Sequence, residues 1–381
     1  MSTFIALPVG QGDAFYLARE NFRVLVDGGK SKSAISPWMH NICKTDHLDV
    51  LVCTHNDNDH ANGVIGLLDN WSGSISEVWL PGSWSYRMRD LFEKPHAFCR
   101  ELVDNISEIG SVGDQDISLS LETFASRQDI CVDLSKKSSF NLDELIDMSK
   151  EIPRNFLEFC LECSEYDPYW FHSCCTIYSN SPLISLFKEA INAASNIRQI
   201  VDLAYHRGCK IRFFEYGNKV SGGLPLMLVP MNSQEMISLR PAEIEALFFL
   251  ALTTANKESL VFYSPENENE PPVLFTADSD LSCSLSTSPD RSPIVTSPHH
   301  GAEANANAYK VVSTWLRHIV SPIWVRSDCK SKARPGNTFK NQLVKNCTLC
   351  NCGTNPKQTV KFHSRLGHWH VTKGTRRCSC K

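Results

Sequence analysis

Short apolar runs separated by polar, glycine-containing turns recur along the first eighty residues. Runs of this kind, bounded by turn residues, are typical of β-strands. The pattern predicts strands at residues 3–9, 14–18, 22–26, 48–53 and 77–80. Helices are predicted at residues 35–42 and 62–68. An order of strand, loop, helix and strand favours an α/β fold built in layers.

The middle of the chain differs, because apolar residues recur there at helical spacing. The spacing is clearest in segments 91–109, 142–163 and 183–207. We therefore interpret residues 85–208 as a mainly helical insertion in the α/β domain. Beyond it, the sequence predicts strands at residues 210–216, 224–230, 256–262, 272–278 and 294–300, and a helix at residues 242–252.

The strand predicted for residues 48–53 ends in a polar loop that holds four potential metal ligands. These are His55, Asp57, Asp59 and His60. A loop at the end of a buried strand is where α/β proteins commonly place their chemistry. A solvated turn would explain the two Asp, which favour turns, but not the two His. We therefore predict that a cation binds this loop and neutralises the clustered charge.

The loop sequence Thr-His-x-Asp-x-Asp-His-x-x-Gly, from Thr54 to Gly63, resembles the metal motif of the metallo-β-lactamase fold. It is similar to the variant found in the hydrolase domain of the DNA-uptake protein ComEC and in the phosphorylcholine esterases of teichoic acid. The commoner family pattern has His at the position of Asp57. The resemblance implies an αββα sandwich.

Three further segments resemble family motifs in the same order along the chain. The opening Val9-Gly-Gln-Gly-Asp13 is followed by Asp27-Gly-Gly, although Pro8 stands where the family usually has Asp or Asn. Asp27 would then orient a metal ligand, whereas its alternative role is to cap a turn. Asn256-x-x-Ser-Leu-Val is also family-like, and Asn256 would likewise support the ligands.

The last two motifs supply the remaining ligands. Thr-Ala-Asp278 stands where the family has Thr-Gly-Asp, and Asp278 would be the carboxylate that bridges two metals. His299-His300-Gly resembles the final metal motif. By this resemblance His300 binds metal, while His299 faces the substrate.

The resemblance implies two divalent metal ions, Zn²⁺ or Mn²⁺. One ion would be held by His55, Asp57 and Asp278, and the other by Asp59, His60, Asp278 and His300. An Asp in place of His at position 57 makes the site harder and so favours Mn²⁺ beside Zn²⁺. The expected catalytic residues are His299 and Asp59.

Composition sets limits on the class of protein. The chain has 381 residues, enough for one large domain or two small ones. No apolar run is long enough to span a membrane and no signal peptide is visible, so we expect a cytoplasmic protein. Sixteen Cys spread over this length do not suggest a disulfide scaffold, and we interpret them as buried thiols or metal ligands.

Charge is distributed unevenly. The net charge is −4, but residues 330–381 contain 12 Lys and Arg and no acidic residue. Blocks of one sign often mark surfaces that bind nucleic acid. We therefore set residues 331–381 apart from the domain at residues 1–330, as a basic tail. Its expected nucleic-acid contacts are Lys357, Lys361, Arg365, Arg376 and Arg377.

The same tail contains two groups of closely spaced Cys. Cys347, Cys350, Cys378 and Cys380 are predicted to form a structural zinc site, with Cys352 as a possible replacement. His363, His368 and His370 lie between the groups and are further potential ligands. The alternative is unligated thiols.

Together these features predict a metal-dependent hydrolase of phosphodiester bonds, with DNA or RNA as its substrate. Two alternatives stay open. One is hydrolysis of a small phosphodiester or nucleotide, and the other is a binding or regulatory module that retains the fold without turnover. The helical insertion offers a surface for a protein partner.

Overall fold

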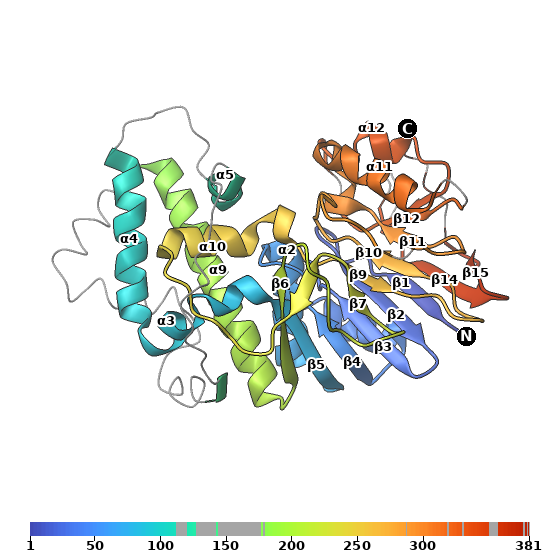
Figure 1. Ribbon diagram of the computed structural model, residues 1–381, viewed down its shortest axis with the longest axis horizontal. Helices are drawn as coiled ribbons and strands as arrows, with labels where there is room; N and C mark the ends of the chain where they lie inside the picture. The colour runs from blue at the N-terminus through green and yellow to red at the C-terminus, as the bar shows by residue number, and fades with distance from the viewer. Residues whose placement is uncertain are drawn as a thin grey trace. The chain divides into compact units, whose positions relative to one another are not determined.

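The apolar runs of the sequence form two mixed β-sheets, which face each other within one compact unit of the chain (Figure 1). The computed structural model describes residues 1–111, 120–126, 142–143, 177, 180–286, 288–317, 320–329, 331–349, 357–375, 378 and 380. The first unit comprises Met1–Pro81, His206–Glu235 and Asn256–Lys381, and the second comprises Gly82–Tyr205 and Met236–Ala255. The predicted α/β class is therefore confirmed.

The larger sheet has the strand order β15-β14-β1-β2-β3-β4-β5-β6-β8. Its strands are β1 Thr3–Ala6, β2 Phe15–Arg19, β3 Phe22–Val26, β4 His47–Val52, β5 Ser74–Pro81, β6 Lys210–Tyr216, β8 Ser233–Glu235, β14 Val360–Arg365 and β15 His368–Val371. Strands β3, β4, β5 and β6 are parallel neighbours, so their carboxyl ends lie along the same edge. The structure confirms the predicted bounds of β3 and β6.

The smaller sheet has the strand order β13-β12-β11-β10-β9-β7. Its strands are β7 Val229–Pro230, β9 Phe262–Ser264, β10 Val273–Phe275, β11 Ile294–Thr296, β12 Ile323–Arg326 and β13 Lys345–Cys347. Strands β10 and β11 are parallel. The prediction of a strand over 224–230 was too long, because Leu224 and Leu228 bond to each other's backbone across a tight turn before β7 begins.

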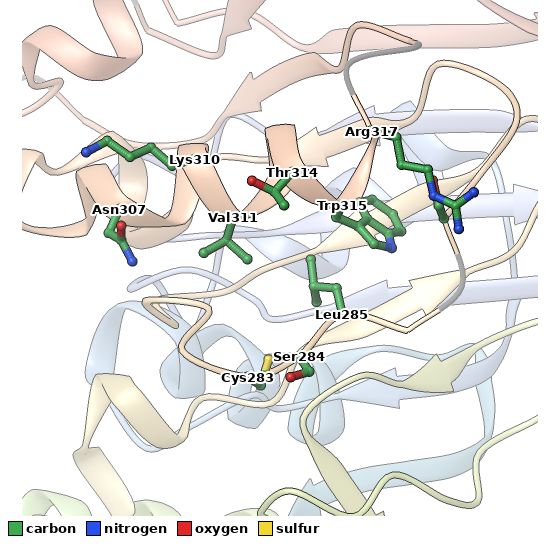
Figure 2. A pocket seen from close by; sticks show the side chains of 10 residues that line it. Cys283, Ser284, Leu285, Asn307, Lys310, Val311, Thr314, Trp315 and Arg317 are labelled. Carbon is green, nitrogen blue, oxygen red and sulfur yellow. The ribbon is translucent and has the colours of Figure 1, made fainter.

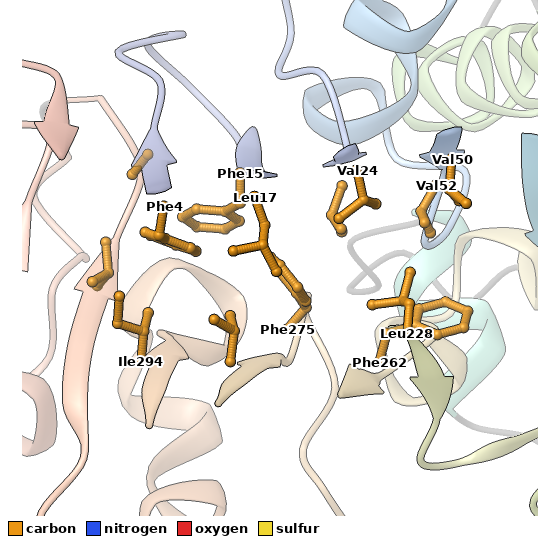
Figure 3. Packing of buried hydrophobic residues seen from close by; sticks show 14 of the residues in the cluster. Phe4, Phe15, Leu17, Val24, Val50, Val52, Leu228, Phe262, Phe275 and Ile294 are labelled. Carbon is orange, nitrogen blue, oxygen red and sulfur yellow. The ribbon is translucent and has the colours of Figure 1, made fainter. Parts of the chain in front are cut away.

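The space between the sheets is filled by the alternate apolar residues of each strand. Figure 3 shows Phe4, Phe15, Leu17, Val24 and Val50 of the larger sheet facing the side chains of the smaller one. The residues between them, such as Leu25 and Leu51, point to the opposite face and are fully buried there as well. Burial on both faces explains why these strands appear as continuous apolar runs in the sequence.

The α-helices of this unit are α1 Ile35–Trp38, α2 Asn58–Asn70, α11 Ala306–Trp315 and α12 Asn337–Lys340. Helices α2 and α11 are longer than the other two. The helix predicted for 35–42 changes character at Met39, where a π-helical turn, Met39–Cys43, continues it. Helix α11 packs on the outer face of the smaller sheet, where Val312 and Trp315 contact the cluster around Val295 and Trp324.

The second unit is helical in the residues described. Its elements are η2 Gly82–Ser85, α3 Met88–Glu93, α4 Pro95–Ser111, α5 Leu121–Ser126, α9 Ser181–His206 and α10 Ala246–Thr254. Helix α10 belongs here because Glu101 of α4 accepts a hydrogen bond from the Ala246 amide at 2.9 Å. The insertion thus takes in residues 236–255 as well as most of the range 85–208. The helix predicted for 142–163 lies almost wholly outside the described residues.

The expected separate tail differs from the structure. Strand β14 pairs with β1, β15 pairs with β14, and β13 pairs with β12, so this segment extends both sheets of the first unit. The reason is visible in β14, where Val360 and Phe362 point into the core while Lys361 and Arg365 point away from it. Within the described part of the chain, no helix is long and apolar enough to cross a bilayer.

Candidate metal centre

Five loops of the first unit bring acidic and His side chains together at the ends of strands from both sheets. The loops follow β1, β3, β4, β10 and β11, and they carry Asp13, Asp27, the 55–60 segment, Asp278 and the His299–His300 pair. Parallel neighbours end at the same edge, so β3 and β4 present their loops side by side, and so do β10 and β11.

Helix α2 positions the loop after β4. Asp57 is its N-cap residue, and Asp59 and His60 lie in its first turn. The helix lies so close to the turn after β3 that a Cβ on Gly63 would be 1.8 Å from the carbonyl oxygen of Gly28. Only glycine allows this approach, and it places His60 beside Asp27.

The first cluster consists of His55, Asp57 and Asp278. Nε2 of His55 lies 3.7 Å from Oδ2 of Asp57 and 3.9 Å from Oδ2 of Asp278. Ligand atoms about 2.0–2.2 Å from one ion lie about 3–4 Å from one another, so these distances suit a single cation. His55 and Asp278 are buried, whereas Asp57 is partly exposed.

The second cluster surrounds the other oxygen of Asp278. Oδ1 of Asp278 lies 3.3 Å from Nε2 of His60 and 3.7 Å from Nε2 of His300. Oδ2 of Asp59 lies 3.4 Å from the same atom of His300. Asp13, His60, Asp278 and His300 also group as potential ligands. Each oxygen of Asp278 therefore faces one cluster of potential ligands.

The hydrogen bonds of the three buried His support a metal site. Nδ1 of each ring has an oxygen partner: Asp27 for His60 at 2.8 Å, Asp13 for His300 at 3.0 Å, and the Thr54 hydroxyl for His55 at 3.1 Å. Among the residues that the structure describes, Nε2 of each ring is buried without a hydrogen-bond partner, as is Oδ1 of Asp278. Buried polar atoms are rarely left unpaired, so these converging atoms fit divalent cations.

Electrostatics favour positive charge at the same place. Burial opposes protonation of His60 and His300, but the carboxylate of Asp278 and their other acidic neighbours raise the pKa of both His well above the usual value. Burial likewise opposes ionisation of Asp278, yet His300 and His60 hold its pKa well below the usual range. A divalent cation could supply the positive charge in place of protons.

The adjacent His299 and His300 differ in their surroundings. The His300 side chain is fully buried, whereas the His299 side chain is 23% exposed and its Nε2 lies 3.7 Å from Oδ2 of Asp278. The expected roles, in which His300 binds metal and His299 meets the substrate, stay a prediction.

Strained backbone is concentrated around the ligands. Asp27, Ala277, His299 and His300 all have positive φ, between 46° and 59°. Such conformations are costly for residues with a side chain and commonly occur at functional sites.

Two residues of the centre had no functional role in the sequence interpretation. Asp13 appears in the sequence only as the end of the opening motif that begins at Val9, with no role assigned to it, although it contacts His300. Arg326 is fully buried, and its Nε donates a 2.6 Å hydrogen bond to the carbonyl of His300. A charged residue at the end of an apolar strand was the available signal for Arg326.

The two residues expected to support the metal ligands, Asp27 and Asn256, differ in their contacts. Asp27 accepts hydrogen bonds from the Thr54 amide, the Thr54 hydroxyl and His60, each at 2.8 Å. It therefore orients His60, a potential metal ligand, and also ties down the backbone at Thr54. Asn256 begins the 3₁₀ turn η4 Asn256–Glu258, and its carbonyl accepts from the Ser259 amide. That segment is held at the centre because the Leu260 amide bonds to the Thr54 carbonyl.

A separate group of thiols lies in the C-terminal segment. Cys347, Cys378 and Cys380 have sulfur atoms within 4.8 Å of one another, and Sγ of Cys347 is 3.4 Å from Sγ of Cys378. They could hold a metal ion. Cys350 and Cys352 lie outside the described residues. So do Arg376 and Arg377, whereas Lys357 and Arg365 are exposed and Lys361 is half-buried.

Comparison with known proteins adds no family to this picture. A scan of the sequence against models of protein families finds no match, and a search of curated proteins finds no significant similarity.

Proposed function

We propose that this protein is a metal-dependent phosphodiesterase of the metallo-β-lactamase fold, and that its substrate is a nucleic acid. The observation that carries the proposal is the division of Asp278 between two clusters of potential ligands. A carboxylate in that position suits a pair of cations that share one ligand. Two-metal sites are common in phosphatases and nucleases, where they stabilise both the attacking and the leaving oxygen.

The potential ligands would be shared between two ions. His55, Asp57 and Asp278 would hold one ion, and His60, Asp59, His300 and Asp278 the other. When bound, such ions supply Lewis acidity and a nucleophile at neutral pH. Mixed imidazole and carboxylate ligands are compatible with Zn²⁺ and Mn²⁺.

Two buried carboxylates would keep the imidazoles in the required orientation. Asp27 accepts from Nδ1 of His60 and Asp13 from Nδ1 of His300. Each hydrogen bond leaves Nε2 as the atom that carries the lone pair. His299, which is partly exposed beside Asp278, would protonate the leaving oxygen or stabilise charge on the phosphoryl group.

The cluster of three Cys side chains in the C-terminal segment would hold a second kind of metal ion. We propose that Cys347, Cys378 and Cys380 bind a structural Zn²⁺. Thiolates around tetrahedral Zn²⁺ lie about 3.8 Å apart, which is compatible with the sulfur positions. Cys347 ends β13 of the smaller sheet, whereas Cys378 and Cys380 follow β15 of the larger one. The ion would therefore link the two sheets.

The substitution Asp59→Ala tests the reaction. It removes a carboxylate 3.4 Å from Nε2 of His300, and we expect the loss of at least one metal equivalent and of hydrolysis of bis-p-nitrophenyl phosphate. Asp280→Asn is the matched control, because Asp280 lies in the same unit and outside both clusters. Wild-type hydrolysis by the Asp59→Ala protein, with its fold verified by circular dichroism, would refute the proposed centre.

A further inference from the structure

An open groove of about 540 Å³ runs along one face of helix α11 in the first unit (Figure 2). Its two walls are the helix and the loop that follows Asp278. The residues that line it are Cys283, Ser284, Leu285, Ser288, Asn307, Lys310, Val311, Thr314, Trp315 and Arg317. In Figure 2 the side chains of α11 form a row from Asn307 to Trp315, with Arg317 just past the end of the helix, and Cys283, Ser284 and Leu285 lie across from them.

Both walls of the groove begin at the proposed metal centre. The loop starts just after Asp278, and the helix starts a few residues after His300. The side-chain amide of Asn305 joins the two starting points, because it donates a 3.0 Å hydrogen bond to the carbonyl of Asp278. Asn307 at the near end of the groove is two residues further along. The groove therefore leads away from the metal centre.

The far part of the groove is also fixed. Nε1 of Trp315 donates a 3.2 Å hydrogen bond to the carbonyl of Ser286, which ties the end of α11 to the loop. The Trp315 ring in turn packs edge-on against Tyr263, with 5.4 Å between ring centroids. The walls are thus connected at both ends, and the groove does not need to form when a ligand binds.

The charge of the groove is one-sided. Lys310 and Arg317 line it and are exposed, and among the described residues that line it none is acidic. Lys310 lies within α11, and Arg317 lies seven positions further along, just past the C-cap residue Leu316. Exposed cations spaced along a groove suit a chain of phosphates better than a single small anion. Val311 and Leu285 add apolar surface between them.

We propose that this groove binds the part of a single-stranded nucleic acid that extends beyond the phosphodiester at the metal centre. Lys310 and Arg317 contact its phosphates, without reading base sequence. The position of the reacting phosphate rests on the proposed function, whereas binding of nucleic acid in the groove does not. Such binding assigns a polymer, rather than a small phosphodiester, as the substrate.

The test is the double variant Lys310→Gln with Arg317→Gln, bound to a phosphorothioate (dT)20 that resists cleavage. Loss of two phosphate contacts should weaken binding about ten-fold and reduce the log–log salt slope by about 1.4. Hydrolysis of bis-p-nitrophenyl phosphate should be unchanged. Lys219→Gln is the matched control, since Lys219 is exposed in the loop after β6 and does not line the groove.

Unchanged affinity and salt slope in the double variant would refute the groove. If the double variant proves unstable, Thr314→Asp places one negative charge on the same exposed face and should weaken binding in the same way. Polyglutamate that binds the wild type as tightly as (dT)20 would show that the groove accepts an acidic protein, which also overturns the proposal. Groove-dependent binding without any hydrolysis of bis-p-nitrophenyl phosphate would refute only the proposed reaction.

Discussion

Oδ1 of Asp13 lies 3.0 Å from Nδ1 of His300, although 287 residues separate them in the chain. Asp13 follows the first strand of the larger sheet, and His300 follows β11 of the smaller one. The contact therefore joins the two sheets at the candidate metal centre. Because Nδ1 donates to the carboxylate, Nε2 of His300 is left to bind a cation.

Asp13→Ala should weaken metal binding without unfolding the protein. Loss of a carboxylate that orients a metal-binding imidazole typically costs about 10–100-fold in metal affinity. Competition with a chromophoric chelator measures this directly. Asp280→Asn should leave the affinity as it is. Equal metal affinities of Asp13→Ala and wild type would show that the contact between Asp13 and His300 does not serve a metal site.

The His299–His300 pair should separate metal binding from turnover. His300→Ala removes a buried nitrogen 3.7 Å from Asp278 and should lower metal occupancy. His299→Ala removes a partly exposed ring and should keep both metals while lowering the rate by about 10²–10⁴-fold, as for a lost general acid. Metal analysis and steady-state rates on the same preparations test both. The opposite pattern would exchange the two roles.

The sequence predicted the local features of this centre far better than its long-range contacts. Strands β3 and β4 and the four potential ligands after β4 lie within one segment, so periodicity and residue type were enough to predict where these side chains gather. The partner of Asp13 could not be found in this way, because nothing near Asp13 indicates which distant strand will end beside it. That position depends on how the two sheets face each other.

The C-terminal segment was misjudged for a different reason. Its charge indicated a separate tail, yet β14 alternates buried Val360, Phe362 and Ser364 with outward-facing Lys361 and Arg365. This alternation is itself a strand signal. The excess of positive charge indicated a separate module, although charged residues of β14 lie on the outer face of a sheet.

Ala277→Gly should stabilise the protein slightly. The positive φ of Ala277, 46°, costs about 1–2 kcal/mol for a residue with a Cβ, and glycine avoids most of that cost. The greater freedom of glycine in the unfolded chain offsets about 0.4–1 kcal/mol. We expect a net gain of up to about 1 kcal/mol in the free energy of unfolding, measured with urea. A loss of more than that would mean that the Ala277 methyl contributes packing that outweighs the strain.

Cys347→Ser should remove one zinc equivalent and leave the metals of the proposed active centre in place. Cys347 is fully buried beside Cys378 and Cys380, so the ion that links the sheets would lose a central ligand and Tm should fall. Zinc analysis and thermal unfolding measure the two effects. Cys43→Ser is the control, because Cys43 is only partly buried and lies outside the thiol group. Unchanged zinc content in Cys347→Ser would refute the structural site.

Deletion of residues 340–381 should unfold the first unit. It removes strands β13, β14 and β15 and with them the buried side chains of Val360, Phe362 and Trp369. Burial of each such side chain is worth about 1.5–3 kcal/mol, so the three together approach the whole stability of a typical domain, about 5–15 kcal/mol. Circular dichroism and thermal unfolding measure the result. A truncated protein that melts cooperatively near the wild-type temperature would contradict the sheet pairing.

Truncation removes buried side chains together with the positive charge. The role of the basic segment is therefore tested with variants that change only charge in the full-length chain. Lys361→Gln with Arg365→Gln changes only the outward face of β14, so the fold should be kept. If this face contacts single-stranded nucleic acid, affinity should fall and the log–log salt slope should decrease by about 1.4 for two lost phosphate contacts. Hydrolysis of bis-p-nitrophenyl phosphate should not change, because neither residue belongs to the ligand clusters. If the double variant binds nucleic acid as tightly as wild type and Lys219→Gln, the positive charge of β14 has no role in nucleic-acid binding.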